Sequence, residues 1–400
     1  MSAPLFIAGA SARAAAQSAV RAGYSVTAAD LFGDRDLVAI AETHVVDRYP
    51  DALRAIADRV PPMDWMYTGG LENYPELVDA ISSRHRLLGN SGAVLQPARD
   101  PWEWESILRQ AGLPFPGPRR QLPSASAGRW LLKPLASSGG GRIRELRNEV
   151  SVIDRARELA EFSCSEVHAS TRSGLPPVPE GWYCQPWIRG RSLSAAYVAA
   201  DGRATLLCVT RQLVGSKWAG SRGFEYVGSV GPLRLPPQLQ PIYEAIGSLF
   251  AERWGLQGLF GVDTILAGKE IWTIEVNPRY PASIEVWERA TGASAVAWHR
   301  AACSGRSVDV KALPQASRLV GKAIVNAPRD VTIDAATDAR LMHLAQPGLT
   351  PGLADLPHIG QTIATGAPVL TVFAEGEDYE ATYRRLRTCV RHLRHALTRH

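Results

Sequence analysis

Two strand-like segments joined by a very short turn limit how this chain can fold. Apolar and polar residues alternate over 270–277 (EIWTIEVN), which is the pattern of a half-buried strand, and 259–266 (LFGVDTIL) precedes it. Gly268–Lys269 between them predict a hairpin, so the two segments should pair as antiparallel neighbours. Pro278 cannot continue a ladder, so the second strand should end directly after its last polar residues.

The polar residues of this hairpin suit a divalent cation and a phosphate. Asp263 and Glu275 would point to one face in the paired register, and Asn277, two residues beyond Glu275, faces the same way. Two carboxylates and one amide oxygen suit Mg²⁺, which keeps waters and phosphate oxygens as its other ligands. Arg279 follows, so a metal and phosphate site is favoured over a polar pair at a sheet edge.

A glycine-rich motif lies further towards the N-terminus, in the sequence RWLLKPLASSGGGRIREL. Trp130–Leu132 predict a strand with Lys133 at its end, and Ser137–Gly141 form a loop before a further strand. Consecutive glycines let backbone N–H groups turn towards phosphate oxygens, and a lysine adds a compact positive charge. The motif is not a Walker A loop, because no G-K-[ST] opens a helix, and on its own a plain turn explains it equally well.

Two further segments supply candidate substrate contacts. Residues 181–212 predict an antiparallel meander whose last strand carries Arg211 at its end, where it would face the cleft and hold a carboxylate or phosphate. An ordinary surface arginine is the alternative. Glu72 and Asn73, in the motif GGLENYP, follow a predicted strand at the edge where open α/β sheets place ligands.

The N-terminal residues predict a βαβ unit of a parallel sheet whose second strand ends at Asp30. Gly9 and Asp30 have the spacing of a dinucleotide site, but Ser11 and Ala14 replace the other two glycines that approach a pyrophosphate. We therefore expect a Rossmann-like sheet that does not bind NAD.

Length and composition indicate a protein of two or three domains with ordinary soluble character. The chain has 400 residues, of which 46% are hydrophobic and 21% charged, and no apolar run approaches the roughly 18–20 residues of a membrane span. Its first residues lack the basic region of a signal peptide, and its five cysteines form no CxxC pair. These features predict reduced thiols, no zinc site and a cytoplasmic location.

The net charge of +5 resides mainly in the C-terminal tail, which has six arginines and no acid over 383–400. Leu386, Val390, Leu393 and Leu397 recur there at helical spacing, so we expect an amphipathic helix with a solvated basic face. Binding of an acidic ligand or partner is the alternative, but neither a nucleic acid nor a membrane is expected as a partner.

Taken together, the lysine and glycine loop, a hinge strand and the pattern D-x11-E-x-N-P-R resemble the ATP-grasp superfamily of ligases. The segments YTGGLENYP and EVNPRYPASIEVWE and the β-rich tail look similar to predicted ATP-dependent carboligases related to biotin carboxylase. The resemblance implies a mixed α/β and α+β fold. Its parts would be a Rossmann-like domain (1–95), a two-subdomain ATP-grasp core (96–305) and a small β-rich module ending in a basic helix (306–400).

The resemblance also implies a role for each matching residue. Lys133 and the loop Ser137, Ser138, Gly139, Gly140 and Gly141 would bind the ATP phosphates, and the hinge Gln185, Pro186, Trp187 and Ile188 would pair with adenine. Asp263, Glu275 and Asn277 would hold Mg²⁺, with Mn²⁺ as an alternative, and Arg279 would stabilise the transferred phosphoryl group. Lys133, Arg211 and Arg279 are the residues expected to act in the reaction.

Several positions depart from the family pattern. A second lysine usually follows an Asp at the position of Asp100, where this chain has Pro101. Either Arg99 or one of Arg119–Arg120 makes that phosphate contact instead, or ATP binds less tightly. The acid that commonly holds the ribose is missing, because Ser192 lies at about its position.

Two further departures concern carboxylation. Biotin carboxylase has a Glu four residues after its arginine, where this chain has Ser283, although Glu285 is close. No Lys flanked by Met occurs in the β-rich tail, so no biotinylation is expected.

The resemblance therefore implies an ATP-dependent ligase that joins a small carboxylate to an amine through an acyl phosphate, releasing ADP and phosphate. The predicted carboligases are linked to one-carbon metabolism, so synthesis of a one-carbon carrier cofactor is one context. The alternatives are a bicarbonate-activating carboxylase and an ATP-binding protein without turnover. Related ligases often dimerise through their front domain, which makes a homodimer an open expectation.

Overall fold

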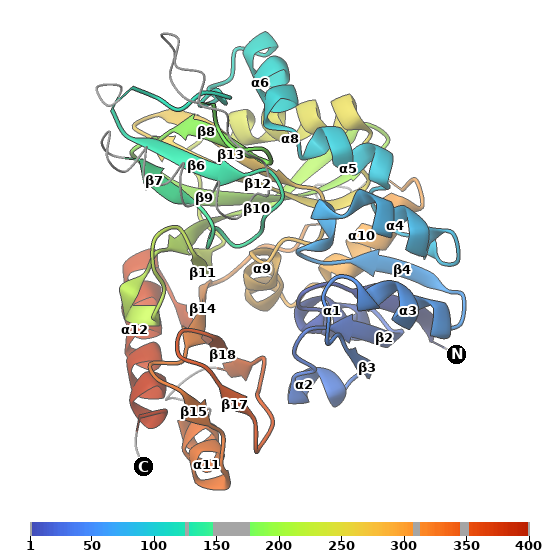
Figure 1. Ribbon diagram of the computed structural model, residues 1–400, viewed down its shortest axis with the longest axis vertical. Coiled ribbons are helices and arrows are strands. Elements are labelled where there is room, and N and C mark those ends of the chain that lie inside the picture. The colour runs from blue at the N-terminus through green and yellow to red at the C-terminus, as the bar shows by residue number, and fades with distance from the viewer. Residues whose placement is uncertain (1, 125–127, 147–176, 307–312, 345–351, 399–400) are drawn as a thin grey trace.

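The computed structural model describes residues 2–124, 128–146, 177–306, 313–344 and 352–398. Its helices and strands form three main bodies, which Figure 1 shows around a central helix, α9 (Ile284–Thr291). In that view the N-terminal sheet and the C-terminal helices lie on opposite sides of α9. Strands β6 to β10, β12 and β13 lie above α9, and β14 and β18 lie beside and below it.

The N-terminal body is a five-stranded parallel sheet in the order β3-β2-β1-β4-β5. Its strands are β1 (Ala3–Ala8), β2 (Tyr24–Asp30), β3 (Glu42–Val45), β4 (Asp64–Tyr67) and β5 (Arg86–Leu87). Its helices are α1 (Arg13–Arg21), α2 (Arg35–Val38), α3 (Ala52–Arg59), η1 (Leu71–Asn73), α4 (Pro75–Ser82) and α5 (Gly92–Ala98). The next helix, α6 (Pro101–Gln110), lies outside this body, because its buried side chains pack in the core around Tyr197 and Phe260. The predicted Rossmann-like sheet is confirmed, and Glu72 and Asn73 lie in η1, just beyond the carboxyl end of β4.

A small antiparallel sheet, β7-β6-β8, carries the glycine-rich motif. It consists of β6 (Trp130–Pro134), β7 (Arg144–Leu146) and β8 (Trp182–Pro186). Lys133 is the fourth residue of β6, and the predicted hinge 185–188 begins at the end of β8.

The largest sheet has eight strands in the order β13-β12-β9-β10-β11-β14-β18-β16. Its strands are β9 (Arg191–Ala200), β10 (Arg203–Val214), β11 (Tyr226–Gly231), β12 (Gly258–Ala267), β13 (Glu270–Asn277), β14 (Leu319–Asn326), β16 (Gly352–Ala354) and β18 (Pro368–Gly376). The predicted hairpin is therefore confirmed as β12 and β13. β14, β18 and β16 come from the C-terminal quarter of the chain yet extend the sheet that contains this hairpin, and the limits 1–95, 96–305 and 306–400 stay a proposed division.

Helices cover this sheet along its length. They are α8 (Gln240–Trp254), α9, α10 (Ala295–Cys303), α11 (Ala335–Leu344) and α12 (Tyr379–Ala396), with η2 (Lys217–Ala219) and the short pair β15 (Val331–Thr332) and β17 (Thr362–Ile363) beside them. α12 is the predicted terminal helix, and Leu386, Val390, Leu393 and Leu397 are all buried in its apolar face. Arg394 of this helix turns inwards and donates to the carbonyl of Asn326 at 2.6 Å.

A buried cluster of charges joins the N-terminal body to α9 and to strand β14. Arg13 at the start of α1 donates through Nε to Asp355 at 2.8 Å and pairs with Glu285 of α9. Lys322 of β14 donates to the second oxygen of Glu285 at 2.7 Å. Burial alone would raise the pKa of Glu285, but Arg13 and Lys322 outweigh it and lower that pKa well below its usual range. Glu285 is therefore a charged structural carboxylate.

The described cysteines, Cys184, Cys208, Cys303 and Cys389, are free thiols, and Cys164 lies outside the described residues. Within the described chain, no helix is both long enough and apolar enough to cross a membrane.

Candidate active site

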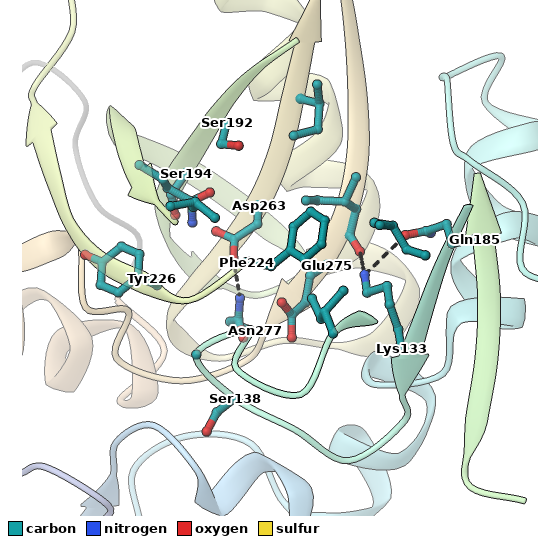
Figure 2. A pocket seen from close by; sticks show the side chains of 18 of the residues that line it. Lys133, Ser138, Gln185, Ser192, Ser194, Phe224, Tyr226, Asp263, Glu275 and Asn277 are labelled. Carbon is teal, nitrogen blue, oxygen red and sulfur yellow. Dashed lines mark hydrogen bonds between the residues drawn. The ribbon is translucent and has the colours of Figure 1, made fainter. Parts of the chain in front are cut away.

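The predicted site residues line a cavity of about 450 Å³ between the small sheet and the eight-stranded sheet. Figure 2 shows Asp263, Glu275 and Asn277 in its middle, with Lys133 and Gln185 towards one end and Tyr226 towards the other. The predicted residues that line it are Lys133, Ser138, Gly139, Gly140, Gln185, Pro186, Trp187, Ile188, Asp263, Glu275, Asn277 and Arg279. Residues as far apart in sequence as Leu131 and Ser283 thus face one space.

The three proposed metal ligands meet at the end of the β12–β13 hairpin. Asp263 is the direct cross-strand partner of Glu275, as the sequence predicts, and a bulge follows at Asp263–Thr264. Asn277 donates through Nδ2 to Asp263 at 3.3 Å, and its Oδ1 accepts from Arg279 at 3.3 Å. Burial and the charge of Glu275 raise the pKa of Asp263, although Ser194 and Gln212 oppose this by hydrogen bonding. Two crowded carboxylates beside an amide form a donor set that fits Mg²⁺.

Cations surround Glu275. Burial alone would raise its pKa, but Arg99, Lys133 and Arg279 together lower it, so the carboxylate is held in its charged form. Arg99 makes the direct contact, with Nη1 2.8 Å from Oε1 of Glu275. A site with this excess of positive charge around the proposed metal ligands is suited to a polyanion such as a triphosphate.

Lys133 links the phosphate end of the cavity to the hinge. Its Nζ donates to Oε1 of Gln185 at 3.2 Å and to the carbonyl of Ile274 at 3.3 Å. Gln185 in turn donates through Nε2 to the carbonyl of Pro116 at 2.9 Å. The buried amide of Gln185 therefore fixes the lysine, while Pro186 and Ile188 continue the cavity wall.

Two residues of the N-terminal body reach the site. Glu72 is fully buried, accepts from Nε of Arg279 at 3.1 Å and accepts from the backbone N–H of Gly70 at 2.6 Å. Asn73 accepts from Arg99 at 3.3 Å and donates to the carbonyl of Ser137 at 3.4 Å. The motif GGLENYP thus orients Arg279 and the glycine loop, and its predicted contact with substrate stays a prediction.

Arg211 takes a different direction from the one expected. Its guanidinium carbon lies 5.0 Å from the ring centroid of Tyr379 in α12, and it is not among the described residues that line the cavity. Successive side chains of a strand point to opposite faces, so Gln212 faces the cavity instead. The expected substrate role of Arg211 has no supporting contact in this arrangement.

Sequence reasoning overlooked several residues that the fold brings into the cavity, namely Ser194, Gln212, Phe224 and Tyr226. Figure 2 shows Ser194 and Tyr226 on the side away from the hinge and Phe224 between Asp263 and Glu275. Strand alternation offered a signal for Gln212, since it follows Arg211, but nothing local marks Phe224 or Tyr226. Two predicted residues lie at the margin: Ser137 lines a smaller adjoining cavity, and Gly141 lines neither cavity.

The glycine loop packs directly on Phe224 and on the start of β11, where Tyr226 N donates to the carbonyl of Gly139 at 2.9 Å. Gly140 has φ +75°, and a Cβ there would lie 2.1 Å from the carbonyl oxygen of Phe224.

We expect Gly140→Ala to raise the Kd for ATP about tenfold or more, because the loop can no longer pack against Phe224. Gly139→Ala is the matched control, since it has φ +72° but no atom within 4 Å of its Cβ. Equal effects of the two substitutions on nucleotide titrations would contradict the role of the close contact.

The chain carries an ATP-grasp domain, because residues 98–283 match the family model of that domain. That range contains the glycine loop, the hinge, the β12–β13 hairpin and Arg279, so the matched family and the cavity coincide. The resemblance inferred from the motifs is therefore confirmed at the level of this domain.

Individual relatives belong to several reaction types. A formate-dependent phosphoribosylglycinamide formyltransferase from Marinobacter nauticus is 27% identical over 282 residues, which are 65% of this chain and 64% of the relative. The chain thus aligns with somewhat less than two thirds of that relative.

Solved structures share the fold at low identity. The biotin carboxylase domain of Hydrogenobacter thermophilus 2-oxoglutarate carboxylase, with MgADP and bicarbonate, has a TM-score of 0.72 and 16% identity over 96% of this chain and 89% of that one. An ADP complex of N5-carboxyaminoimidazole ribonucleotide synthetase has a TM-score of 0.69 and 17% identity, and the match covers 99% of this chain and 98% of that one. An L-amino acid ligase from Bacillus licheniformis has a TM-score of 0.69 and 15% identity, and the match covers 97% of this chain and 96% of that one.

Proposed function

We propose that this protein is an ATP- and Mg²⁺-dependent carboxylate–amine ligase. The observation that carries the proposal is the meeting of Lys133, the glycine loop, the Asp263–Glu275–Asn277 set and Arg279 around one cavity. The ATP-grasp domain and its similarity to a formyltransferase, a synthetase and an amino acid ligase support it.

Each part of the cavity has a task in this reaction. The apolar wall near Leu131, Ile143 and the hinge receives adenine, and Lys133 with the glycine loop receives the phosphates. A bound Mg²⁺, or Mn²⁺, supplies charge neutralisation at the phosphates. Arg279, oriented by Glu72, stabilises the phosphoryl group as it moves to the substrate carboxylate. The closed loop then keeps water from the acyl phosphate until the amine attacks.

A bicarbonate-activating carboxylase is the second candidate, because biotin carboxylases are among the similar folds. Two observations speak against it. Ser283 occupies the position where the resemblance implies a bicarbonate glutamate, and nearby Glu285 is held by Arg13 and Lys322. A carboxylate with a lowered pKa and two cationic partners is a poor general base, so carboxylation lacks its proton acceptor.

The proposal includes three finer points. The substrates are a small carboxylate and an amine, and formate is a reasonable first carboxylate because the curated relative is formate-dependent. Synthesis of a one-carbon carrier cofactor stays the proposed context, in the cytoplasm. A homodimer is proposed as well, since the similar 2-oxoglutarate carboxylase domain was solved as a dimer.

ADP release from the purified full chain with Mg–ATP tests this function. Pools of amino acids, simple amines and bicarbonate are compared, with formate added in a parallel series. We expect release that depends on an amine together with a carboxylate. Release that depends on bicarbonate alone would replace the ligase by a carboxylase. Tight ATP binding with no ADP release in any pool would favour the alternative of an ATP-binding protein that catalyses no reaction.

A further inference from the structure

Arg99 occupies an unusual position for a residue just outside the main motifs. It follows α5 and precedes α6, and its side chain, only 10% exposed, reaches between β13 and the glycine loop. Pro101, at the first position of α6, stands where the family resemblance implies a phosphate-binding lysine. The buried cation Arg99 therefore lies two residues before the position where the lysine is expected.

The guanidinium of Arg99 holds four segments together. Nη1 donates to Oε1 of Glu275 at 2.8 Å and to the carbonyl of Val276 at 2.9 Å. Nη2 donates to the carbonyl of Ser137 at 3.1 Å and to Oδ1 of Asn73 at 3.3 Å. Its Nε is buried and has no hydrogen-bond acceptor among the described residues. One N–H of the group is therefore available to an incoming ligand.

A small cavity of about 20 Å³ lies beside Arg99, and its lining also includes Lys133, Ser138, Gly139, Gly140 and Glu275. Lys133, Glu275 and the loop residues Ser138 to Gly140 also line the large cavity, so the glycine loop lies between the two spaces. Two cations and a glycine loop converge here, which is the arrangement that binds phosphate oxygens. The space is about that of one water, so a phosphate would enter from the large cavity as the loop adjusts.

The other arginines named for this role lie elsewhere. Arg120 stacks over the ring of Trp102, with its guanidinium carbon 3.9 Å from the centroid, and Arg119 donates to the neighbouring carbonyl of Pro118. Both residues are exposed, and neither lines the two cavities described above. Arg99 is therefore the arginine that the fold delivers to the phosphate end.

We propose that Arg99 is an exchangeable counter-ion: it pairs with Glu275 before nucleotide binds and with the ATP phosphates afterwards. The idea rests on the proposed ATP site and deepens it. A guanidinium beside Glu275 repels a divalent cation, so the nucleotide-free protein would hold metal weakly. Phosphate oxygens that draw the guanidinium away from Glu275 would make the carboxylate available, so metal and nucleotide bind together.

Two binding measurements on the full chain test this exchange. The first is titration of the nucleotide-free protein with Mn²⁺, followed by electron paramagnetic resonance. The second is calorimetric titration with ATP, ADP and AMP. Arg99→Gln removes the positive charge, whereas Arg99→Lys keeps the charge but loses the two-nitrogen donor geometry of the guanidinium. Arg120→Gln is the matched control. Thermal unfolding of each variant shows whether it is folded.

The two measurements should change in opposite directions. We expect Arg99→Gln to weaken ATP and ADP about tenfold or more, to change AMP by less than about twofold, and to tighten Mn²⁺ about fivefold. Arg99→Lys should fall between Arg99→Gln and the unaltered protein, and Arg120→Gln should match the latter. Equal weakening of AMP and ATP, unchanged or weaker Mn²⁺ binding, or an ATP loss in Arg120→Gln alone would each overturn the exchange.

The test separates this inference from the ligase reaction. Neither titration needs a carboxylate or an amine, so a wrong reaction type would leave both results intact. Failure of the unaltered protein to bind ATP would overturn the nucleotide site, and with it both proposals. Normal ATP binding without ADP release would overturn the ligase alone.

Discussion

Glu275→Gln is expected to reduce ATP-dependent ADP release by about 10²–10³-fold, the scale seen when one preorganised charge is removed from a transition state. Glu275 is paired in register with Asp263 and faces Arg99, Lys133 and Arg279. Glutamine keeps the shape but removes the negative charge that these cations and a bound metal both require. Initial rates of ADP formation at saturating ATP, with the amine and carboxylate that stimulate release, measure the effect.

Glu270→Gln is the matched control for this substitution. Glu270 begins the same strand, is exposed, and accepts from Trp272 Nε1 at 3.3 Å. Its loss should leave the rate within about twofold, as for other exposed residues without a site contact. A Glu275→Gln protein as active as the control would mean that the metal site lies elsewhere.

Arg13→Ala is expected to lower the free energy of unfolding by about 3–5 kcal/mol, because Asp355 loses its charged partner and the buried Glu285 loses one of its two close cations. The side chain of Arg13 is 1% exposed and that of Glu285 is 4% exposed. Asp355 would lose its bidentate contact, and Glu285 would keep Lys322 as its close partner. We expect a fall in Tm of roughly 5–10 °C, measured by calorimetry at one fixed scan rate.

Arg21→Ala is the control for this substitution. It shows whether the loss of stability is specific to Arg13 or follows from removing any arginine of α1. Arg21 pairs with Glu288 at 3.2 Å, but its side chain is 42% exposed, so solvent screens the pair. Its removal should cost less than about 1 kcal/mol. Similar Tm losses for Arg13→Ala and Arg21→Ala would argue that the buried cluster does not hold α1, α9 and β14 together.

The local parts of the site were predictable from the order of residues. The β12–β13 hairpin follows from alternation and from Gly268, which has φ +63° in the turn. Once the hairpin forms, the period of two places Asp263 opposite Glu275 and keeps Asn277 near them. The glycine loop after β6 and the amphipathic α12 are similarly local, because each depends on spacings of a few residues.

The face of the strand to which each side chain points was harder to predict. The end of β10 was expected at Arg211–Gln212, whereas the strand runs to Val214, and Gln212 faces the cavity. A strand has two faces, and residue type alone does not say which of them meets the ligand. Tyr379 of α12, 168 positions away, covers the face that carries Arg211.

By itself, therefore, the sequence determined the strands, turns and loop that bear the proposed metal and phosphate contacts. Only the tertiary structure decided which distant groups control them: Glu72 at Arg279, Arg99 at Glu275, and Arg13 at Glu285. These partners lie 176 to 272 residues apart along the chain. The physical reason is that periodicity reports the face of one element, whereas the partner of a buried charge depends on how separate elements pack.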